Sequence, residues 1–141
     1  MNSGDRPTGG RKMSERFAVT QKAVLVGPAP EERILLLENQ NGVWELPGGQ
    51  LVVGEQPDKG LKRAVSEVTG LDVKVGDPVL TTAWTLDNDD GAFAAIYAAR
   101  SVTEQASLLG GHARAVWMDP EQAIERELNE TQRRAIRRAT E

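Results

Sequence analysis

The hydrophobic positions in the first part of the chain follow the two-residue period of β-strands. Residues 17–26 alternate and then become continuously apolar, which is typical of a strand that enters a core. The Gly-Pro-Ala-Pro segment at 27–30 breaks this strand, and residues 33–37 are predicted to return as its hairpin partner. Asn41-Gly42 is a strong turn signal, so we expect a further short strand over residues 43–46.

A glycine-containing segment and a helix follow. Pro47-Gly48-Gly49 predicts an irregular loop. Pro57 suits the first turn of a helix, residues 59–69 continue it, and Gly70 is well placed to end it. Apolar residues recur along this helix at the spacing of a single face, which predicts a stripe packed against the core: Leu61, Ala64, Val65 and Val68.

The second half of the chain returns to strand-like patterns and ends in helices. Strands are predicted over residues 71–75, 79–86, 92–99 and 114–118, with a turn at 88–91 and a loop at 101–111. Asp119-Pro120 is predicted to open a short helix. Asn129 is the expected cap of the last helix, with Gln132 at the capping-box position. This order of elements predicts the α/β class, as an α/β/α sandwich with a mixed sheet.

Length and composition are those of one globular domain. The chain has 141 residues, of which 39% are hydrophobic and 27% charged. We expect residues 1–16 to be a flexible leader, because they are polar and lack the apolar core of a secretion signal, and residues 17–141 to be the domain. The apolar runs are too short to cross a bilayer, so no membrane association is expected.

Cysteine content and charge narrow the chemistry further. The chain has no cysteine, which excludes disulfides, thiolate nucleophiles and zinc–thiolate sites and makes a cytoplasmic location the default expectation. A net charge of −4 argues against nonspecific nucleic-acid binding as the main role. This acidic balance suits a protein that recruits a divalent cation, but it does not by itself require that the protein binds one.

The segment from Gly48 to the predicted helix is the candidate for chemistry. A glycine loop that leads into a helix brings backbone groups close to a phosphate or a metal ion. Arg63 and Glu67 lie four residues apart on the helix, so their side chains share a face and are able to pair. Taken alone, these residues equally fit a capped amphipathic helix behind a glycine loop.

The spacing of this segment resembles a known motif. Five residues separate Gly49 from Glu55, and seven more lead to Arg63. This resembles the Nudix box, in which Gly, Glu, an Arg-Glu pair, an aliphatic residue, a Glu-Glu pair, Gly and an aliphatic residue recur at such intervals. The matching positions are Gly49, Glu55, Arg63, Glu67, Gly70 and Leu71. The Trp-Glu-Leu-Pro-Gly-Gly entry at 44–49 and the segment at 117–121 are also similar to the family, so the resemblance extends over nearly everything from Phe17 onward.

Two positions of the motif depart from the family pattern. Ala64 stands where the Arg-Glu pair has its glutamate, and Val68 stands where the Glu-Glu pair has its second glutamate. In the family, the first of these often serves as the general base or helps to bind metal, and the other is normally a direct metal ligand. Because Ala64 and Val68 are four residues apart, both losses fall on one helix face. Loss of a general base typically slows a reaction by about 10²- to 10⁴-fold.

The resemblance implies a Nudix-type fold and roles for the residues that remain. It implies catalytic roles for Glu67, Glu55 and Arg63, metal ligation by Glu67, Glu55 and the Gly48 carbonyl, and ligand binding by Gly48, Gly49 and Trp84. Mg²⁺ or Mn²⁺ is expected to bind weakly, since few carboxylates are left, and no organic cofactor is expected. The implied ligand is a small nucleotide-like or diphosphate compound, and the family often forms homodimers.

Other polar and aromatic residues admit two interpretations each. An acidic segment later in the chain consists of Asp87, Asp89 and Asp90. It either supplies a general base from outside the Nudix box or forms a polar hairpin turn, and the turn is favoured. His112 is either an extra acid or base or a structural residue, and the structural role is favoured. For aromatic and basic residues, packing or a solvated face is favoured over base stacking or phosphate contact: Trp44, Trp84, Tyr97, Arg133, Arg134, Arg137 and Arg138.

Three functional hypotheses follow. The first is a nucleoside-diphosphate-type ligand site that resembles a Mg²⁺-dependent pyrophosphohydrolase, with catalysis weakened or altered by Ala64 and Val68. The second is a ligand-sensing or partner-binding module without hydrolysis. The third is a repurposed enzyme of the same fold with non-hydrolytic chemistry.

Overall fold

A mixed β-sheet forms the centre of the protein. The computed structural model describes residues 16–141, so all of the expected leader except Arg16 lies outside the described residues. The elements are β1 (Phe17–Val26), β2 (Ile34–Glu38), β3 (Trp44–Glu45), β4 (Gly48–Gln50), α1 (Pro57–Thr69), β5 (Val73–Thr85), β6 (Gly91–Ser101), β7 (Arg114–Met118), α2 (Pro120–Ala123) and α3 (Glu130–Thr140). The strand order is β3-β2-β1-β6-β5, with β4 paired to β1 and β7 to β2.

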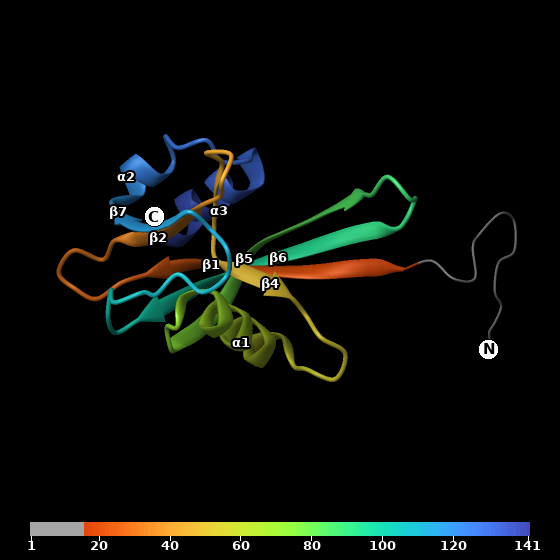
Figure 1. The fold of residues 1–141 in the computed structure, drawn as a ribbon, viewed down its shortest axis with the longest axis horizontal. Helices are drawn as coiled ribbons and strands as arrows, with labels where there is room; N and C mark the ends of the chain where they lie inside the picture. Colours follow the sequence, from red (N-terminus) through yellow and green to blue (C-terminus); the bar gives the residue numbers. More distant parts are fainter. Residues whose placement is uncertain (1–15) are drawn as a thin grey trace, which may run out of the picture.

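Helices cover both faces of this sheet. Helix α1 lies on one side, and α2 and α3 lie on the other (Figure 1). Strand β1 pairs with β6 in parallel and with β2 and β4 in antiparallel orientation. The predicted α/β/α sandwich with a mixed sheet is therefore confirmed. No helix among residues 16–141 is long and apolar enough to cross a membrane.

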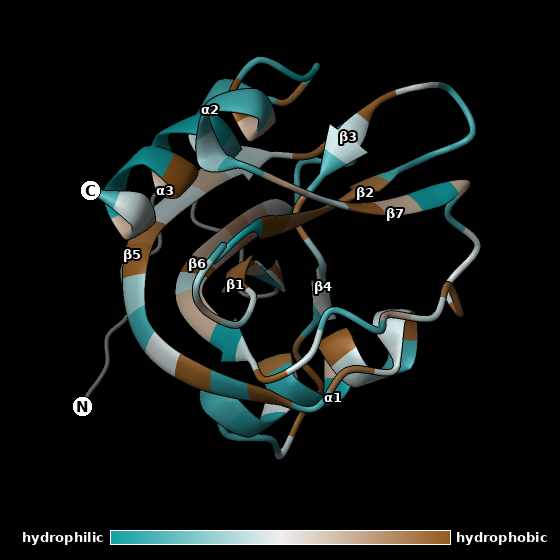
Figure 2. Ribbon diagram, turned by 90° about the vertical axis from the view of Figure 1, so that its left-hand side faces the viewer, coloured by the Kyte–Doolittle hydropathy of each residue, from teal (hydrophilic) through white to brown (hydrophobic). Residues whose placement is uncertain are grey.

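Strand β1 separates two cores because successive side chains of a strand point to opposite faces. Val24 belongs to the core beneath α2 and α3, whereas Ala23 and Leu25 belong to the core beneath α1. Figure 2 shows hydrophobic residues along β1 and β2 in the middle of the fold. The predicted apolar stripe of α1 packs into the second core, with Leu61, Val65 and the partly buried Val68 as contributors.

The predicted loop at Pro47-Gly48-Gly49 is wrong in part, because Gly48–Gln50 forms strand β4. This strand pairs with β1 in the register Lys22–Gly48 and Thr20–Gln50. A Cβ atom on Gly48 would lie only 1.9 Å from the backbone oxygen of Gln21. The glycine that indicates a loop in the sequence thus serves close strand pairing instead.

Strand β5 is one strand where two were predicted. It runs from Val73 to Thr85 along β6, and its register shifts between Val75 and Leu80. Pro78 lies within this irregular stretch, where a missing N–H donor is tolerated. The sequence break is therefore a bulge within a continuous strand.

The helix ends largely follow the sequence signals. Pro57 opens α1, and Gly70 ends it in the left-handed conformation with φ of 74°. The side chain of Asn129 accepts a hydrogen bond from the Gln132 N–H, which confirms the predicted cap of α3. Gln132, however, points its side chain elsewhere: its Oε1 accepts a 2.7 Å hydrogen bond from the Leu46 N–H. It thereby joins α3 to the segment between β3 and β4.

We expect Gly48→Ala to destabilise the protein, because the added methyl group collides with backbone atoms of β1 that have no room to shift. The expected loss is about 1–3 kcal/mol or more in the free energy of unfolding, measured by urea denaturation. Gly49→Ala is the matched control, since its Cβ would meet only the Ala64 methyl group, at 3.0 Å. Equal stability of the two variants would contradict this close approach.

Candidate functional site

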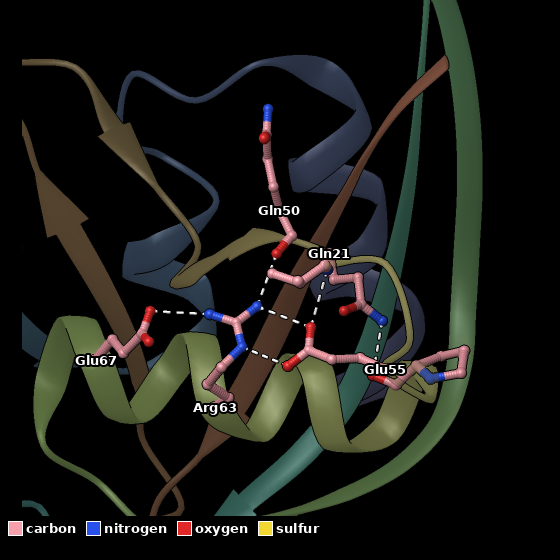
Figure 3. Close-up of polar contacts among 7 residues, drawn as sticks. Gln21, Gln50, Glu55, Arg63 and Glu67 are labelled. Carbon is pink, nitrogen blue, oxygen red and sulfur yellow. Dashed lines mark hydrogen bonds and ion pairs between the residues drawn. The ribbon is translucent and has the colours of Figure 1, made fainter. Parts of the chain in front are cut away.

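Arg63 is the centre of the candidate site. Its Nε donates to Glu55 Oε2 at 2.5 Å and its Nη2 donates to Glu55 Oε1 at 3.0 Å, a bidentate pair. Its Nη1 donates to Glu67 Oε1 at 2.9 Å, and its Nη2 also donates to the Gln50 carbonyl at 2.8 Å. Figure 3 shows the guanidinium group between the two carboxylates. One side chain therefore ties the end of β4, the following loop and helix α1 together.

The two carboxylates bound to Arg63 have different surroundings. Glu55 is 20% exposed and accepts a further 2.9 Å hydrogen bond from the Val52 N–H. The hydrogen bonds from Arg63 and from the Val52 backbone hold the pKa of Glu55 below its ordinary value. Glu67 is 64% exposed. The carboxylate oxygens of Glu55 are therefore occupied by hydrogen bonds within the loop and to Arg63. Glu67 faces solvent, where a ligand is able to reach it.

Ala64 is buried where the family places a glutamate. The side chain of Ala64 is 3% exposed and lies beneath β4, within 3.0 Å of the position that a Cβ on Gly49 would take. This contact places an apolar methyl group directly against the glycine strand. The Ala64 position consequently presents no proton acceptor on that side of α1.

Val68 is covered by the segment that precedes β7. The Leu109 N–H donates to the Val68 carbonyl at 2.9 Å, and the Ser107 N–H donates to the Thr69 carbonyl at 2.7 Å. A Cβ on Gly110 would lie 3.3 Å from Val68 Cγ1. The second lost glutamate has therefore been replaced by a packing contact between α1 and this segment.

The carboxylates around Arg63 do not form a cluster able to hold several metal ions. Within residues 16–141, no group of three or more His, Cys, Asp or Glu side chains is arranged to hold a metal ion. Glu55 is engaged by Arg63 and Val52, and Glu67 is the one carboxylate of the motif that remains solvent-exposed.

A cavity of about 450 Å³ lies on the other side of the sheet from Arg63. Its lining comprises Thr20, Lys22, Thr82, Trp84, Ala94, Ile96, Asn129, Thr131 and Gln132. Gln21, between the first two, points the opposite way and donates to the Pro57 carbonyl of α1 at 2.8 Å. Thr20 and Lys22 pair with Gln50 and Gly48, so strand β4 runs beside the part of β1 that lines the cavity.

Of the predicted ligand-binding residues, Trp84 lines this cavity, whereas Gly48 and Gly49 lie beside β1, which contributes Thr20 and Lys22 to the lining. Trp84 lines the cavity and is 49% exposed, so its indole offers a surface for stacking. Gly48 and Gly49 form the neighbouring strand β4. The structure thus brings Trp84 to the α3 side of the sheet, whereas Glu55, Arg63 and Glu67 gather on the α1 side.

Sequence reasoning missed a second polar cluster, at the border of the cavity. Lys22 Nζ donates to Glu45 Oε1 at 2.6 Å and to the Leu46 carbonyl at 3.1 Å. His112 Nε2 lies 2.7 Å from Glu45 Oε2. Burial raises the pKa of Glu45, but the charge of Lys22 and hydrogen bonds from Lys22 and His112 outweigh it, so the net shift is downward. The available signal was a lysine directly before the apolar run Ala23 to Val26 of a predicted strand.

The remaining candidates form turns and packing contacts. Asp89 has φ of 69°, and the Asp90 N–H donates to Asn88 Oδ1 at 3.0 Å in the hairpin turn between β5 and β6. Trp44 is buried, with the guanidinium groups of Arg114 and Arg126 5.3 and 5.4 Å from its ring.

The α3 arginines and Tyr97 also have identifiable surroundings. Arg133 donates from Nε to the Ile124 carbonyl at 2.7 Å, and Arg138 donates from Nη1 to the Val79 carbonyl at 3.1 Å. Both contacts join α3 to its neighbours in the fold. Tyr97 packs, partly buried, against the core beneath α1.

Comparison with known proteins identifies relatives of this architecture. The family model of the NUDIX domain matches residues 19–139. A MutT-like protein from Streptomyces ambofaciens is 51% identical over 37 residues, which span 26% of this chain and 24% of that protein. The solution structure of the E. coli ORF135 protein covers 92% of both chains, with a TM-score of 0.76 and 20% identity. The MutT protein from Methanosarcina mazei Go1 covers 91% of this chain and 96% of its own, with a TM-score of 0.75 and 21% identity.

The lowered pKa of Glu55 predicts a pH-dependent contribution to stability. A carboxylate whose pKa is lower in the folded than in the unfolded protein stabilises the fold above the unfolded value, about 4.3. That contribution is lost as the pH falls through the folded value. We expect Glu55→Gln to lower the melting temperature at pH 7 and to have progressively less effect below about pH 4.

Arg63→Met provides the control for this pH dependence. Since Arg63 is the main cause of the lowered pKa of Glu55, the pH-dependent difference should shrink strongly when Glu55→Gln is introduced into that background. An undiminished difference would show that the pair does not act as described.

The packing of Val68 predicts that restoring the family glutamate destabilises this chain. Val68→Glu places a carboxylate against Gly110 and the α1 core, so we expect a loss of about 1–3 kcal/mol in urea unfolding. Ser66→Glu, at an exposed position of the same helix, is the control and should change stability little. If both variants unfold like the parent, the segment before β7 does not pack on Val68.

Proposed function

Because the chain belongs to the Nudix family, we propose that residues 17–141 form a domain that binds a nucleoside-diphosphate-type ligand and hydrolyses it slowly. The observation that carries this proposal is the cavity beside β4, which combines an exposed indole with amide and hydroxyl groups. Its volume of about 450 Å³ is within the usual range for small-molecule sites. Its position puts a ligand beside the part of β1 with which β4 pairs, while the Arg63 cluster lies on the α1 side of the sheet.

The geometry supports a ligand that extends past β4. In this arrangement the base or another planar group stacks on Trp84, and the linked phosphates pass the edge of the glycine strand toward α1. Proteins with the same fold include a C. elegans Ap4A hydrolase and an ADP-ribose pyrophosphatase from Streptococcus suis. Because of these names, the first ligands to test are compounds in which the phosphates of a nucleotide are linked to a second group.

The proposed chemistry relies on Glu67 and Arg63. Arg63 orients the Glu67 carboxylate through the 2.9 Å ion pair, while Glu55 anchors the guanidinium group from the loop side. The exposed face of Glu67 makes it the carboxylate best placed to hold a metal ion against the phosphates of the ligand. Ala64 supplies no general base, so we expect slow turnover.

Divalent metal is proposed to bind weakly and together with ligand. Nudix proteins typically use such ions, and Mg²⁺ usually takes one or two protein carboxylates besides phosphate oxygens. Glu67 and the Gly48 carbonyl are the proposed protein ligands, a smaller set than an intact box supplies. Binding without hydrolysis is the alternative function, and it is favoured by the burial of Ala64 and the packing of Val68.

We expect slow turnover of at least one compound among ADP-ribose, diadenosine tetraphosphate and the nucleoside triphosphates, with Mg²⁺ or Mn²⁺ present. Glu67→Gln should reduce this turnover to the rate without protein. Ala64→Glu should increase it by up to about 10²-fold, because it adds a carboxylate where the family has its base. Released phosphate or nucleotide is measured by chromatography over several turnovers.

Ala64→Gln is the matched control for the gain, since it adds nearly the same volume without a carboxylate. Turnover by the parent chain in the usual enzyme range of about 1–10³ per second would contradict weakened catalysis. Turnover that Glu67→Gln leaves unchanged would remove Glu67 from the mechanism. Ligand binding with no turnover at all would favour the alternative function.

A further inference from the structure

Lys22 is a charged side chain in an unusual position. It lies on β1 at the centre of the sheet and is only 18% exposed. Among the nine residues that line the cavity in the described part of the chain, Lys22 is the only charged one. A lysine in such a setting needs partners, and a ligand in the cavity would have its ammonium group within reach.

One of the three N–H donors of Lys22 is not used in its hydrogen bonds to the described residues. An ammonium group carries three N–H bonds. Within residues 16–141, two of them are directed at Glu45 Oε1 and the Leu46 carbonyl, at 2.6 and 3.1 Å. The third is free for an acceptor in the cavity.

Glu45 and His112 hold this ammonium group in place. The Glu45 carboxylate divides its oxygens, with Oε1 bound to Lys22 and Oε2 bound to His112 Nε2 at 2.7 Å. The other ring nitrogen of His112 is buried without a hydrogen-bond partner in the described structure, so Glu45 is the single polar anchor of the imidazole. His112 therefore keeps Oε2 away from Lys22.

The surroundings favour a negatively charged ligand group beside Lys22. Asn129, Thr131 and Gln132 come from the cap and first turn of α3, and the N-terminus of an 11-residue helix adds partial positive charge to the same cavity. Lys22 also pairs in register with Gly48, so its ammonium group lies beside the strand along which the phosphates of the proposed ligand would pass.

We propose that Lys22 binds a phosphate of the ligand directly and without metal, and that Glu45 and His112 are positioning residues for it. This inference rests on the proposed function, because it takes the cavity as the ligand site. In this arrangement the fixed ammonium group of Lys22, on the α3 side of the sheet, balances the negative charge of the phosphate. Recognition of the ligand then does not depend on the carboxylates lost from α1.

The test compares each nucleoside diphosphate with its nucleoside, in EDTA, by calorimetric titration of the whole chain. ADP, GDP, CDP and UDP are the probes, and the ratio of the two dissociation constants isolates the contribution of the phosphates. The parent chain should bind at least one diphosphate more tightly than its nucleoside. Lys22→Met should reduce that preference by about tenfold or more, as expected for a lost charged hydrogen bond.

Variants of the positioning residues should act in opposite directions. Glu45→Gln retains an acceptor for Lys22 but removes the competing negative charge, so the preference for the diphosphate should increase about threefold or more. His112→Ala frees Oε2 of Glu45 to compete for Lys22 and should weaken the preference. Lys62→Met is the control, since Lys62 lies on α1 in an exposed pair with Asp72. If Lys22→Met does not fold, the opposite signs of the other two variants still decide the question.

The outcomes distinguish this inference from the proposed function. A preference for the diphosphate that Lys22→Met and Glu45→Gln leave unchanged overturns the role of Lys22 while the ligand site stands. Binding that requires added Mn²⁺ also overturns metal-independent recognition and keeps the proposed function. If no probe binds with or without Mn²⁺, both proposals fail.

Discussion

The interaction on which the candidate site depends is the bidentate pair between Arg63 and Glu55. It connects the first half of α1 to the loop that leaves β4, and the additional bond from Arg63 to the Gln50 carbonyl fixes the end of that strand. Planar guanidinium and carboxylate groups match in two parallel hydrogen bonds, so this pair also sets an orientation. The position of Glu67 follows from it, because the same guanidinium group binds both carboxylates.

The loss of two glutamates changes the packing around this frame as well as its chemistry. The methyl group of Ala64 lies against the glycine strand, and the Leu109–Gly110 backbone closes over Val68. Both replacements convert a polar helix face into an interface, which stabilises the fold by burial where charged groups would require partners. The retained arginine frame and the lost acidic cluster are thus compatible: Arg63 still shapes the loop, and packing contacts now stand where the acidic cluster would lie.

Local sequence signals predicted most of the fold, whereas long-range contacts did not follow from them. Pro57 and Gly70 mark the ends of α1 because their backbone preferences act at their own positions. The same reasoning misassigned Gly48, whose role depends on the Gln21 backbone more than twenty residues away. The spacing of Arg63 and Glu67 predicted their pair, but the cluster of Lys22, Glu45 and His112 joins three distant segments. No pattern along the chain brings those segments together.

We propose that this domain binds a nucleotide-like ligand without the means to assemble a cluster of metal ions. Titration with Mn²⁺, followed by electron paramagnetic resonance in the presence of a non-hydrolysable ADP-ribose analogue, measures the number of ions bound per chain. We expect at most one weakly bound ion, whose binding depends on Glu67. Two or more tightly bound ions in the unaltered chain would contradict it.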